Sequence, residues 1–286
     1  MLSTLALAAL IVYALIALAM FLLQPRMLFV PARVLHQNPS AQNLRFEDIH
    51  LTTADGVRIH GWLVAARTTI DHARQTVLFL HGNGGNIADR MDSLAILSDF
   101  GFDVFIIDYR GYGRSEGKPS EEGTYRDAMA AWEFLVQDRG LAPESIVILG
   151  RSLGGAIATW LAANVTPGGL IVESTFRSLP TLAARLYPWL PARYLTRFRY
   201  DSLGHAPRIK CPVLVVHSRE DELIPFDEGE KLFAALSEPK TFLEIRGDHA
   251  SGYAQSGEQY WPALAQFVRL NSGHAVQTSA PAAHTQ

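Results

Sequence analysis

The run Gly150-Arg151-Ser152-Leu153-Gly154 contains a serine flanked by two glycines. We expect Ser145–Leu149 to be a strand and Leu153–Ala163 a helix, because a short apolar run is followed by a helix-length segment. A serine on a tight strand-to-helix turn projects its hydroxyl away from the sheet, and the crowded flanking positions must lack side chains. The spacing therefore predicts that Ser152 is a nucleophile, with an ordinary glycine-rich turn as the alternative.

A second glycine-rich run, His81-Gly82-Asn83-Gly84-Gly85-Asn86, follows the strand expected at Thr76–Leu80. Glycines let the backbone approach a substrate closely and point N–H groups toward it. Acyl transfer needs such donors for the developing oxyanion. We expect the backbone N–H groups of Asn83 and Leu153 to form this oxyanion hole. A loop whose glycines serve only the turn is the alternative, and a phosphate loop is disfavoured because no glycine–lysine–serine/threonine follows.

A serine nucleophile also needs a base, and the base needs a carboxylate to orient it. His249 lies directly after the last expected strand, whereas His217 ends the preceding strand and comes too early in the chain. We therefore predict that His249 is the base. Asp221 lies four residues after His217 in a loop, and we predict that it is the orienting acid. Its competitors are Glu220, Glu222 and Asp248, the last disfavoured because a sequence neighbour of the base usually points elsewhere.

The elements that position these residues alternate along the chain. Besides the segments already given, we expect strands at Val104–Asp108, Leu170–Glu173, Val213–His217 and Phe242–Ile245, and helices at Ile87–Asp99, Glu121–Gln137, Asp227–Leu236 and Tyr260–Leu270. Repeated strand-then-helix order predicts a mostly parallel sheet with helices on both faces. A hairpin of Leu44–Leu51 and Val57–Ala65 should add antiparallel strands at one edge.

The motifs resemble those of the α/β-hydrolase superfamily, and within it the membrane-anchored Bem46-like group, which is similar to the mammalian ABHD hydrolases. The supporting runs are His81–Asn86, Asp108–Ser115, Gly150–Gly155, His217–Asp221 with Pro225 behind it, and Gly247–His249. The order Ser152, Asp221, His249 is the α/β-hydrolase order. The resemblance implies an α/β-hydrolase fold, hydrolysis of an acyl bond and no cofactor. We interpret Asp108–Ser115 as structural.

The N-terminus differs from the rest of the chain. Residues 2–23 carry no charge, and about 20 apolar residues suffice to cross the hydrocarbon core of a bilayer. We therefore predict a membrane anchor at residues 1–25. A cleaved signal peptide is the alternative, but it usually has a basic start that this chain lacks. Arg26 and Arg33, which follow the apolar run, favour a cytoplasmic catalytic domain.

The hydrolase domain is expected at residues 34–270, with a cap inserted at 176–210, where prolines break the strand–helix rhythm. Seven basic side chains and six aromatic ones occur in this cap, whereas Asp201 is its only acidic residue. Basic and aromatic residues suit a surface of anionic lipid. The alternative is that the aromatic residues form the cap's core and the arginines its solvated face. Residues 271–286 are polar and predicted to be a disordered tail.

Composition removes several classes of function. The net charge is -3 and the basic residues form no stripe, so nucleic acid is not expected as a partner. Cys211 is the one cysteine, and no ligand spacing indicates a metal site.

We predict a membrane-anchored serine hydrolase that cleaves lipophilic acyl esters or thioesters, with a small-molecule or lipid acyl substrate. A peptidase with the same triad and a non-catalytic binding protein of this fold are the alternatives.

Overall fold

The computed structural model describes residues 2–68 and 75–271. Within them the main sheet has eight strands in the order β10-β9-β8-β7-β4-β6-β3-β2. The strands are β1 (Val30–Pro31), β2 (Phe46–Thr52), β3 (Arg58–Val64), β4 (Gln75–Leu80), β5 (Gly84–Gly85), β6 (Phe102–Asp108), β7 (Ile146–Arg151), β8 (Gly169–Glu173), β9 (Val213–Ser218) and β10 (Lys240–Ile245). From β10 to β6 the neighbours are parallel, whereas β3 is antiparallel to β6 and β2 is antiparallel to β3. The predicted mostly parallel sheet with an antiparallel edge is confirmed.

The helices follow the strands as expected. They are α1 (Leu2–Leu28), α2 (Met91–Asp99), α3 (Glu121–Glu133), α4 (Leu153–Ala162), α5 (Leu179–Leu186), α6 (Ala192–Leu195), α7 (Ser202–His205), α8 (Phe226–Ala235), α9 (Gly252–Gln255) and α10 (Gly257–Asn271), with short turns η1 (Pro39–Gln42), η2 (Ile87–Arg90), η4 (Pro143–Ser145) and η5 (Ala206–Arg208) and a π-helical turn η3 (Phe134–Asp138). Sequence patterns did not predict α9 or the small sheet of β1 and β5. The tail expected at 271–286 lies outside the described residues except for Asn271, which ends α10.

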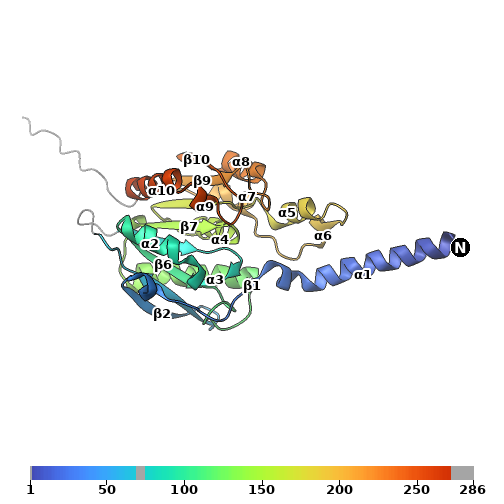
Figure 1. The fold of residues 1–286 in the computed structure, drawn as a ribbon, viewed down its shortest axis with the longest axis horizontal. Helices are drawn as coiled ribbons and strands as arrows, with labels where there is room; N and C mark the ends of the chain where they lie inside the picture. Colours follow the sequence, from blue (N-terminus) through green and yellow to red (C-terminus); the bar gives the residue numbers. More distant parts are fainter. Residues whose placement is uncertain (1, 69–74, 272–286) are drawn as a thin grey trace, which may run out of the picture.

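Helices cover both faces of the sheet (Figure 1). Along β4, Val77 and Phe79 pack in one layer with α2 and α10, whereas Leu78 and Leu80 pack in the other with α3 and α4. Successive side chains of a strand point to opposite faces, so a strand covered on both sides must be apolar at every position. This explains the continuous apolar runs of the central strands.

Helix α1 projects from the domain, and the segment after it is attached to a loop of the core (Figure 1). Residues Ser3–Leu28 are long and apolar enough to cross a membrane, which is a property that an N-terminal signal sequence shares. The helix extends past the predicted boundary at residue 25. Directly after it, β1 pairs in parallel with β5, and the N–H of Val30 donates to the carbonyl of Asn83 at 3.2 Å. The end of α1 is therefore fixed to the glycine-rich loop that follows β4.

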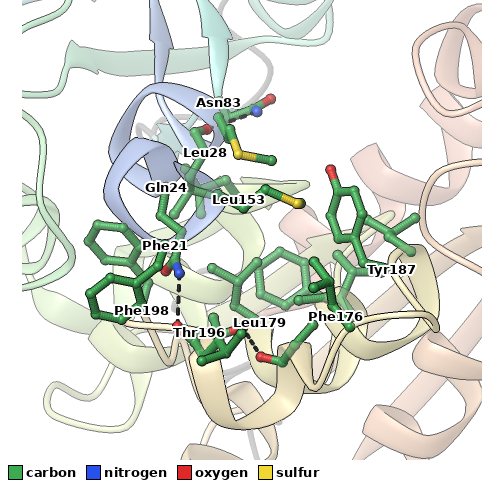
Figure 2. A pocket seen from close by; sticks show the side chains of 18 of the residues that line it. Phe21, Gln24, Leu28, Asn83, Leu153, Phe176, Leu179, Tyr187, Thr196 and Phe198 are labelled. Carbon is green, nitrogen blue, oxygen red and sulfur yellow. Dashed lines mark hydrogen bonds between the residues drawn. The ribbon is translucent and has the colours of Figure 1, made fainter. Parts of the chain in front are cut away.

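The predicted cap segment lies between β8 and β9 and contains α5, α6 and α7. Its aromatic residues differ in burial: Phe176 and Tyr200 are buried, Tyr187 and Phe198 are partly buried, and Trp189 and Tyr194 are 52% and 86% exposed. Its basic residues also divide, since Arg177 and Arg185 form ion pairs with α8 while others remain exposed. Some aromatic residues of the cap therefore form its core, and others lie on its surface together with basic residues. The cap faces the second half of α1 (Figure 2).

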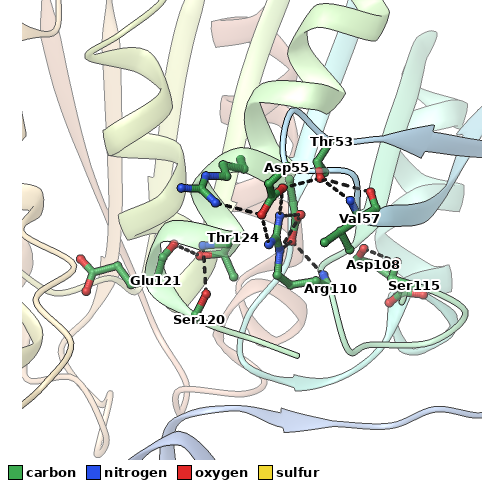
Figure 3. A network of polar contacts seen from close by, with 12 residues as sticks. Thr53, Asp55, Val57, Asp108, Arg110, Ser115, Ser120, Glu121 and Thr124 are labelled. Carbon is green, nitrogen blue, oxygen red and sulfur yellow. Dashed lines mark hydrogen bonds and ion pairs between the residues drawn. The ribbon is translucent and has the colours of Figure 1, made fainter. Parts of the chain in front are cut away.

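A buried ionic network connects the hairpin to the loop after β6 (Figure 3). The guanidinium of Arg110 donates to both carboxylate oxygens of Asp55, at 2.8 and 3.0 Å, and to Asp127 of α3 at 2.9 Å. The side chain of Asp127 is fully buried, whereas that of Arg126, which also contacts Asp55, is 49% exposed. Asp127 therefore depends on Arg110 for charge compensation. This agrees with a structural role for Asp108–Ser115.

Replacing Arg110 by alanine should lower the free energy of unfolding by about 3–5 kcal/mol, because it leaves the charge of Asp127 buried without a partner. The matched control, Arg126→Ala, should cost less than about 1 kcal/mol, because it removes one exposed ion pair. Unfolding of the full-length protein in detergent, followed by tryptophan fluorescence, measures both. Equal losses in the two variants would contradict the importance assigned to the buried pair.

Candidate active site

Ser152 lies on the turn between β7 and α4, with a backbone φ of 55° and ψ of -120°. Such a conformation is strained for a residue with a side chain and persists only when the surroundings enforce it. A Cβ on Gly154 would lie 2.0 Å from the carbonyl oxygen of Leu80, and one on Gly150 would lie 2.4 Å from that of Gly154. Both flanking positions therefore require glycine, as the sequence predicted.

Hydrogen bonds from β8 hold this turn in place. The N–H of Ser152 donates to the carbonyl of Glu173 at 2.8 Å, and the hydroxyl of Thr175 donates to the carbonyl of Ser152 at 2.8 Å. The carboxylate of Glu173 accepts from Arg151 at 2.9 Å and from Tyr260 at 2.7 Å. Burial disfavours the charge of Arg151, but Glu173 outweighs burial and raises the pKa of Arg151. Sequence reasoning missed this support, although Arg151 lies inside the motif.

The structure brings the three predicted side chains together from three separate loops. His249, after β10, has its Nε2 3.0 Å from Oγ of Ser152 and its Nδ1 2.8 Å from Oδ2 of Asp221, which follows β9. The other oxygen of Asp221 accepts the N–H groups of Leu223 and Ile224 at 3.0 and 2.7 Å. The Asp221 side chain is fully buried and that of His249 is 14% exposed. The carboxylate is thus fixed with one oxygen facing the imidazole.

The competing glutamates have other contacts. Glu220 accepts the backbone N–H of Gly247 at 2.9 Å, and Glu222 accepts the backbone N–H of His249 at 3.0 Å. Both carboxylates therefore accept hydrogen bonds from the backbone of the loop that carries His249, whereas the His249 ring hydrogen-bonds to Asp221. They position this loop, a role for which the sequence offered no signal beyond their proximity to Asp221.

Asp248 and His217 also lie close to the site, but neither hydrogen-bonds to the side chain of Ser152, His249 or Asp221. The carboxylate of Asp248 is exposed and accepts the N–H and the hydroxyl of Ser251 at 2.8 and 2.7 Å. His217 is buried, which lowers the pKa of its imidazole, and its Nε2 donates to the carbonyl of Ile224 at 2.8 Å. A neutral ring committed to a backbone carbonyl is not a base for Ser152.

The predicted oxyanion donors lie beside the serine. Asn83 and Leu153 line the same cavity as Ser152, and neither of their backbone N–H groups donates to another of the described residues. Leu153 is the first residue of α4, where the helix dipole favours negative charge. Asn83 is held from two sides: its carbonyl accepts from Tyr112 at 2.8 Å, and its side-chain amide donates to the carbonyl of Leu28 at 3.0 Å.

His81 precedes this loop and is structural. Its ring is fully buried against Tyr109, and burial lowers its pKa to about 3, so it stays neutral. Tyr109 also donates its hydroxyl to the carbonyl of His81 at 2.9 Å. Tyr109 and Tyr112, both in the run Asp108–Ser115, therefore hold the loop that carries Asn83.

A cavity of about 260 Å³ extends from Ser152 between α1 and the cap (Figure 2). Its wall is mainly aliphatic and aromatic, and none of the described residues lining it is charged. The polar side chains of the wall are those of Gln24, Asn83, Ser152, Tyr187 and Thr196. Such a lining suits an apolar group placed next to the serine hydroxyl.

One group of side chains has the composition of a metal site. Asp48, His50 and His60 of the hairpin offer ligand atoms within 4.8 Å of one another. One oxygen of Asp48 already accepts from Arg114 at 2.9 Å, and the other contacts Trp62 at 3.2 Å as well as His60. Hydrogen bonding therefore occupies both oxygens of Asp48, and the group lies at the sheet edge away from Ser152.

Comparisons with known proteins give consistent results. A family model described as the alpha/beta hydrolase fold matches residues 75–184. The chain is 34% identical over 250 residues to the alpha/beta hydrolase domain-containing protein WAV2 of Arabidopsis thaliana, covering 80% of each chain. It is 30% identical over 240 residues to the protein bem46 of Schizosaccharomyces pombe, covering 82% of this chain and 80% of bem46. The Pyrococcus furiosus esterase Pf2001 shares the fold, with a TM-score of 0.71 at 21% identity over 85% of this chain and all of that one.

Replacing Asp221 by asparagine should slow the reaction of Ser152 with a fluorophosphonate by roughly 10³- to 10⁴-fold, because the amide cannot hold the imidazole in the required tautomer. Asp248→Asn should react at close to the wild-type rate, because its carboxylate contacts only its own turn. Labelling rates of the two folded variants measure the difference. The reverse ranking would show that the wrong carboxylate has been assigned.

Proposed function

This chain belongs to the α/β-hydrolase superfamily and to its Bem46-like group, and from that premise we propose that it is a serine hydrolase of lipophilic acyl esters or thioesters. The continuous hydrogen-bonded series from Ser152 through His249 to Asp221 is the observation that carries the proposal. Nucleophile, base and orienting acid are each within hydrogen-bond distance of the next, which is the arrangement that activates a serine hydroxyl.

In the proposed reaction, Oγ of Ser152 bonds to the acyl carbon while Nε2 of His249 takes its proton. The carbonyl oxygen becomes an oxyanion between the N–H groups of Asn83 and Leu153. When this intermediate collapses, the bond to the leaving alcohol or thiol breaks and His249 returns the proton to it. A water molecule then gives a proton to His249 and attacks the acyl carbon of the acyl-enzyme. When the second intermediate collapses, the bond between the acyl carbon and Oγ breaks, His249 gives its proton to Oγ, and the acid leaves with Ser152 restored. Asp221 stabilises the imidazolium in both steps.

The cavity wall supports an apolar acyl group. A peptidase would need a charged or strongly polar site for a peptide terminus, and the described residues of the wall carry no charge. A non-catalytic binding protein would not need the strained Ser152 backbone or two unpaired N–H groups beside its hydroxyl. These features favour the esterase or thioesterase assignment over both alternatives.

We also propose that α1 is an uncleaved membrane anchor. Its second half contacts the cap, and its last residue, Leu28, accepts a hydrogen bond from the side chain of Asn83, so cleavage would expose a surface that α1 covers in the folded domain. The exposed Arg26 at its end favours a cytoplasmic catalytic domain.

Replacing Ser152 by alanine should reduce hydrolysis of p-nitrophenyl esters by roughly 10⁴-fold or more, because the attacking oxygen is lost. The unfolding midpoint should change little, since only one hydroxyl is removed. Retention of more than a few per cent of activity would contradict the assignment of the nucleophile. Wild-type cleavage of amino-acid amides but not esters would select the peptidase, and no labelling of Ser152 by a fluorophosphonate would select the binding protein.

The anchor assignment predicts that the protein extracted from membranes retains residues 1–25. Intact mass spectrometry checks this directly, because a cleaved signal peptide would be missing. Protease added to intact cells should leave the catalytic domain undigested, and digestion there would place the domain on the opposite side of the membrane.

A further inference from the structure

We infer that α1 is part of the substrate site: its cap-facing side forms one wall of the acyl pocket, and the acyl chain reaches Ser152 from the bilayer between α1 and the cap. This inference rests on the proposed function, because it concerns the acyl group of that reaction. It gives the N-terminal helix a role in choosing the substrate in addition to holding the enzyme at the membrane.

The burial pattern of α1 has one protein-facing side. From residue 3 to residue 16 every side chain is exposed, and burial begins only in the second half of the helix. The partly buried positions there are Ala17, Met20, Phe21, Gln24, Pro25 and Leu28. Spacings of three and four residues place these side chains on one face of a helix. The opposite face is free to contact lipid along its whole length.

Hydrogen bonds fix α1 against the cap in one register. Gln24 donates from its side-chain amide to the carbonyl of Leu195 at 2.8 Å (Figure 2). Its side-chain oxygen accepts the backbone N–H of Arg197 at 2.7 Å. The hydroxyl of Tyr13 donates to the carbonyl of Trp189 at 3.0 Å. In apolar surroundings a broken hydrogen bond of this kind is costly. The helix is therefore seated on the cap rather than loosely tethered to the domain.

The same face of α1 lines the cavity that contains Ser152. Ala17, Met20 and Phe21 contribute to its wall. Across the cavity, α5 presents Leu179, Leu182, Ala183 and Leu186, which also follow helical spacing. Two apolar helix faces thus enclose the space that leads to the serine hydroxyl. Without α1 this space would have no wall on one side.

The position of α1 is also tied to the catalytic machinery. The side chain of Asn83, whose N–H is a proposed oxyanion donor, donates to the last residue of α1, Leu28, at 3.0 Å. Two residues further, Val30 pairs with the same loop. The helix that lines the acyl pocket is consequently attached to the loop that supplies the oxyanion donor Asn83.

The geometry directs the mouth of the pocket to the bilayer. Tyr13 and Gln24, whose side chains hydrogen-bond to the cap, lie about 16 Å apart along a helix that rises 1.5 Å per residue. The cap therefore lies beside a stretch of α1 that is apolar enough to cross the membrane (Figure 1). There it exposes Leu186, Trp189 and Tyr194, side chains that suit the membrane interface. A lipid acyl chain can enter between the two elements without crossing water.

The test uses the full-length protein in phosphatidylcholine nanodiscs. Ala17→Trp should obstruct the far end of the pocket, whereas the matched control Leu18→Trp adds the same ring to a side chain that is 53% exposed. We expect the ratio of kcat/KM for p-nitrophenyl dodecanoate to that for the acetate to fall at least ~10-fold in Ala17→Trp and to stay unchanged in Leu18→Trp. Met20→Ala, which enlarges the pocket, should shift the preference toward longer chains.

The rate of fluorophosphonate labelling at Ser152 separates this inference from the proposed function. If the wild type cleaves no ester and Ser152 is unlabelled, the proposed function fails. If all variants label at the wild-type rate but the chain-length preference is the same in each, the role of α1 is overturned while the proposed function stands. An equal fall of the ratio in Ala17→Trp and Leu18→Trp would also overturn it, and the Met20→Ala result decides the matter if Ala17→Trp does not fold.

Discussion

The site depends on one strained residue. Ser152 has a positive φ on the turn from β7 to α4, a conformation that costs of order 1–3 kcal/mol and persists only because its surroundings enforce it. The close approach of Gly154 to Leu80 and the hydrogen bonds with Glu173 and Thr175 supply that enforcement. Because these contacts come from both neighbouring strands, Ser152 has this geometry only when the parallel sheet is complete.

The sheet also decides which side chains lie beside Ser152. Parallel strands end at the same edge, so the loops after β4, β7, β9 and β10 converge there although the chain separates them widely. Each loop has its own support: two tyrosines hold the loop of Asn83, two backbone N–H groups hold Asp221, and Glu222 holds the backbone of His249. The hydrogen-bonded series from Ser152 through His249 to Asp221 is therefore the product of three separately anchored loops, and the loop after β4 places Asn83 beside them.

Charge is distributed to keep the cavity apolar. The buried guanidinium of Arg110 is compensated beneath the hairpin, and that of Arg151 is compensated by Glu173 behind the serine turn. Neither contributes to the cavity wall, where α1 and the cap supply apolar side chains instead. An acyl carbonyl beside Ser152 would thus have the two N–H groups as its main polar contacts, which is the condition under which they stabilise an oxyanion most.

Sequence patterns by themselves determined the strand–helix order and the sheet type, because strand periodicity and turn glycines are local properties that neighbouring residues express. They also predicted Ser152 from the glycines of its turn and His249 from its place after the last strand. They did not separate Asp221 from Glu220 and Glu222 except by analogy of position, since three adjacent carboxylates differ only in what the folded loop places opposite them. Nor did they identify the face of α1 that lines the cavity. A helix that is apolar on all sides carries no amphipathic signal, so only packing against the cap decided which side became part of the pocket.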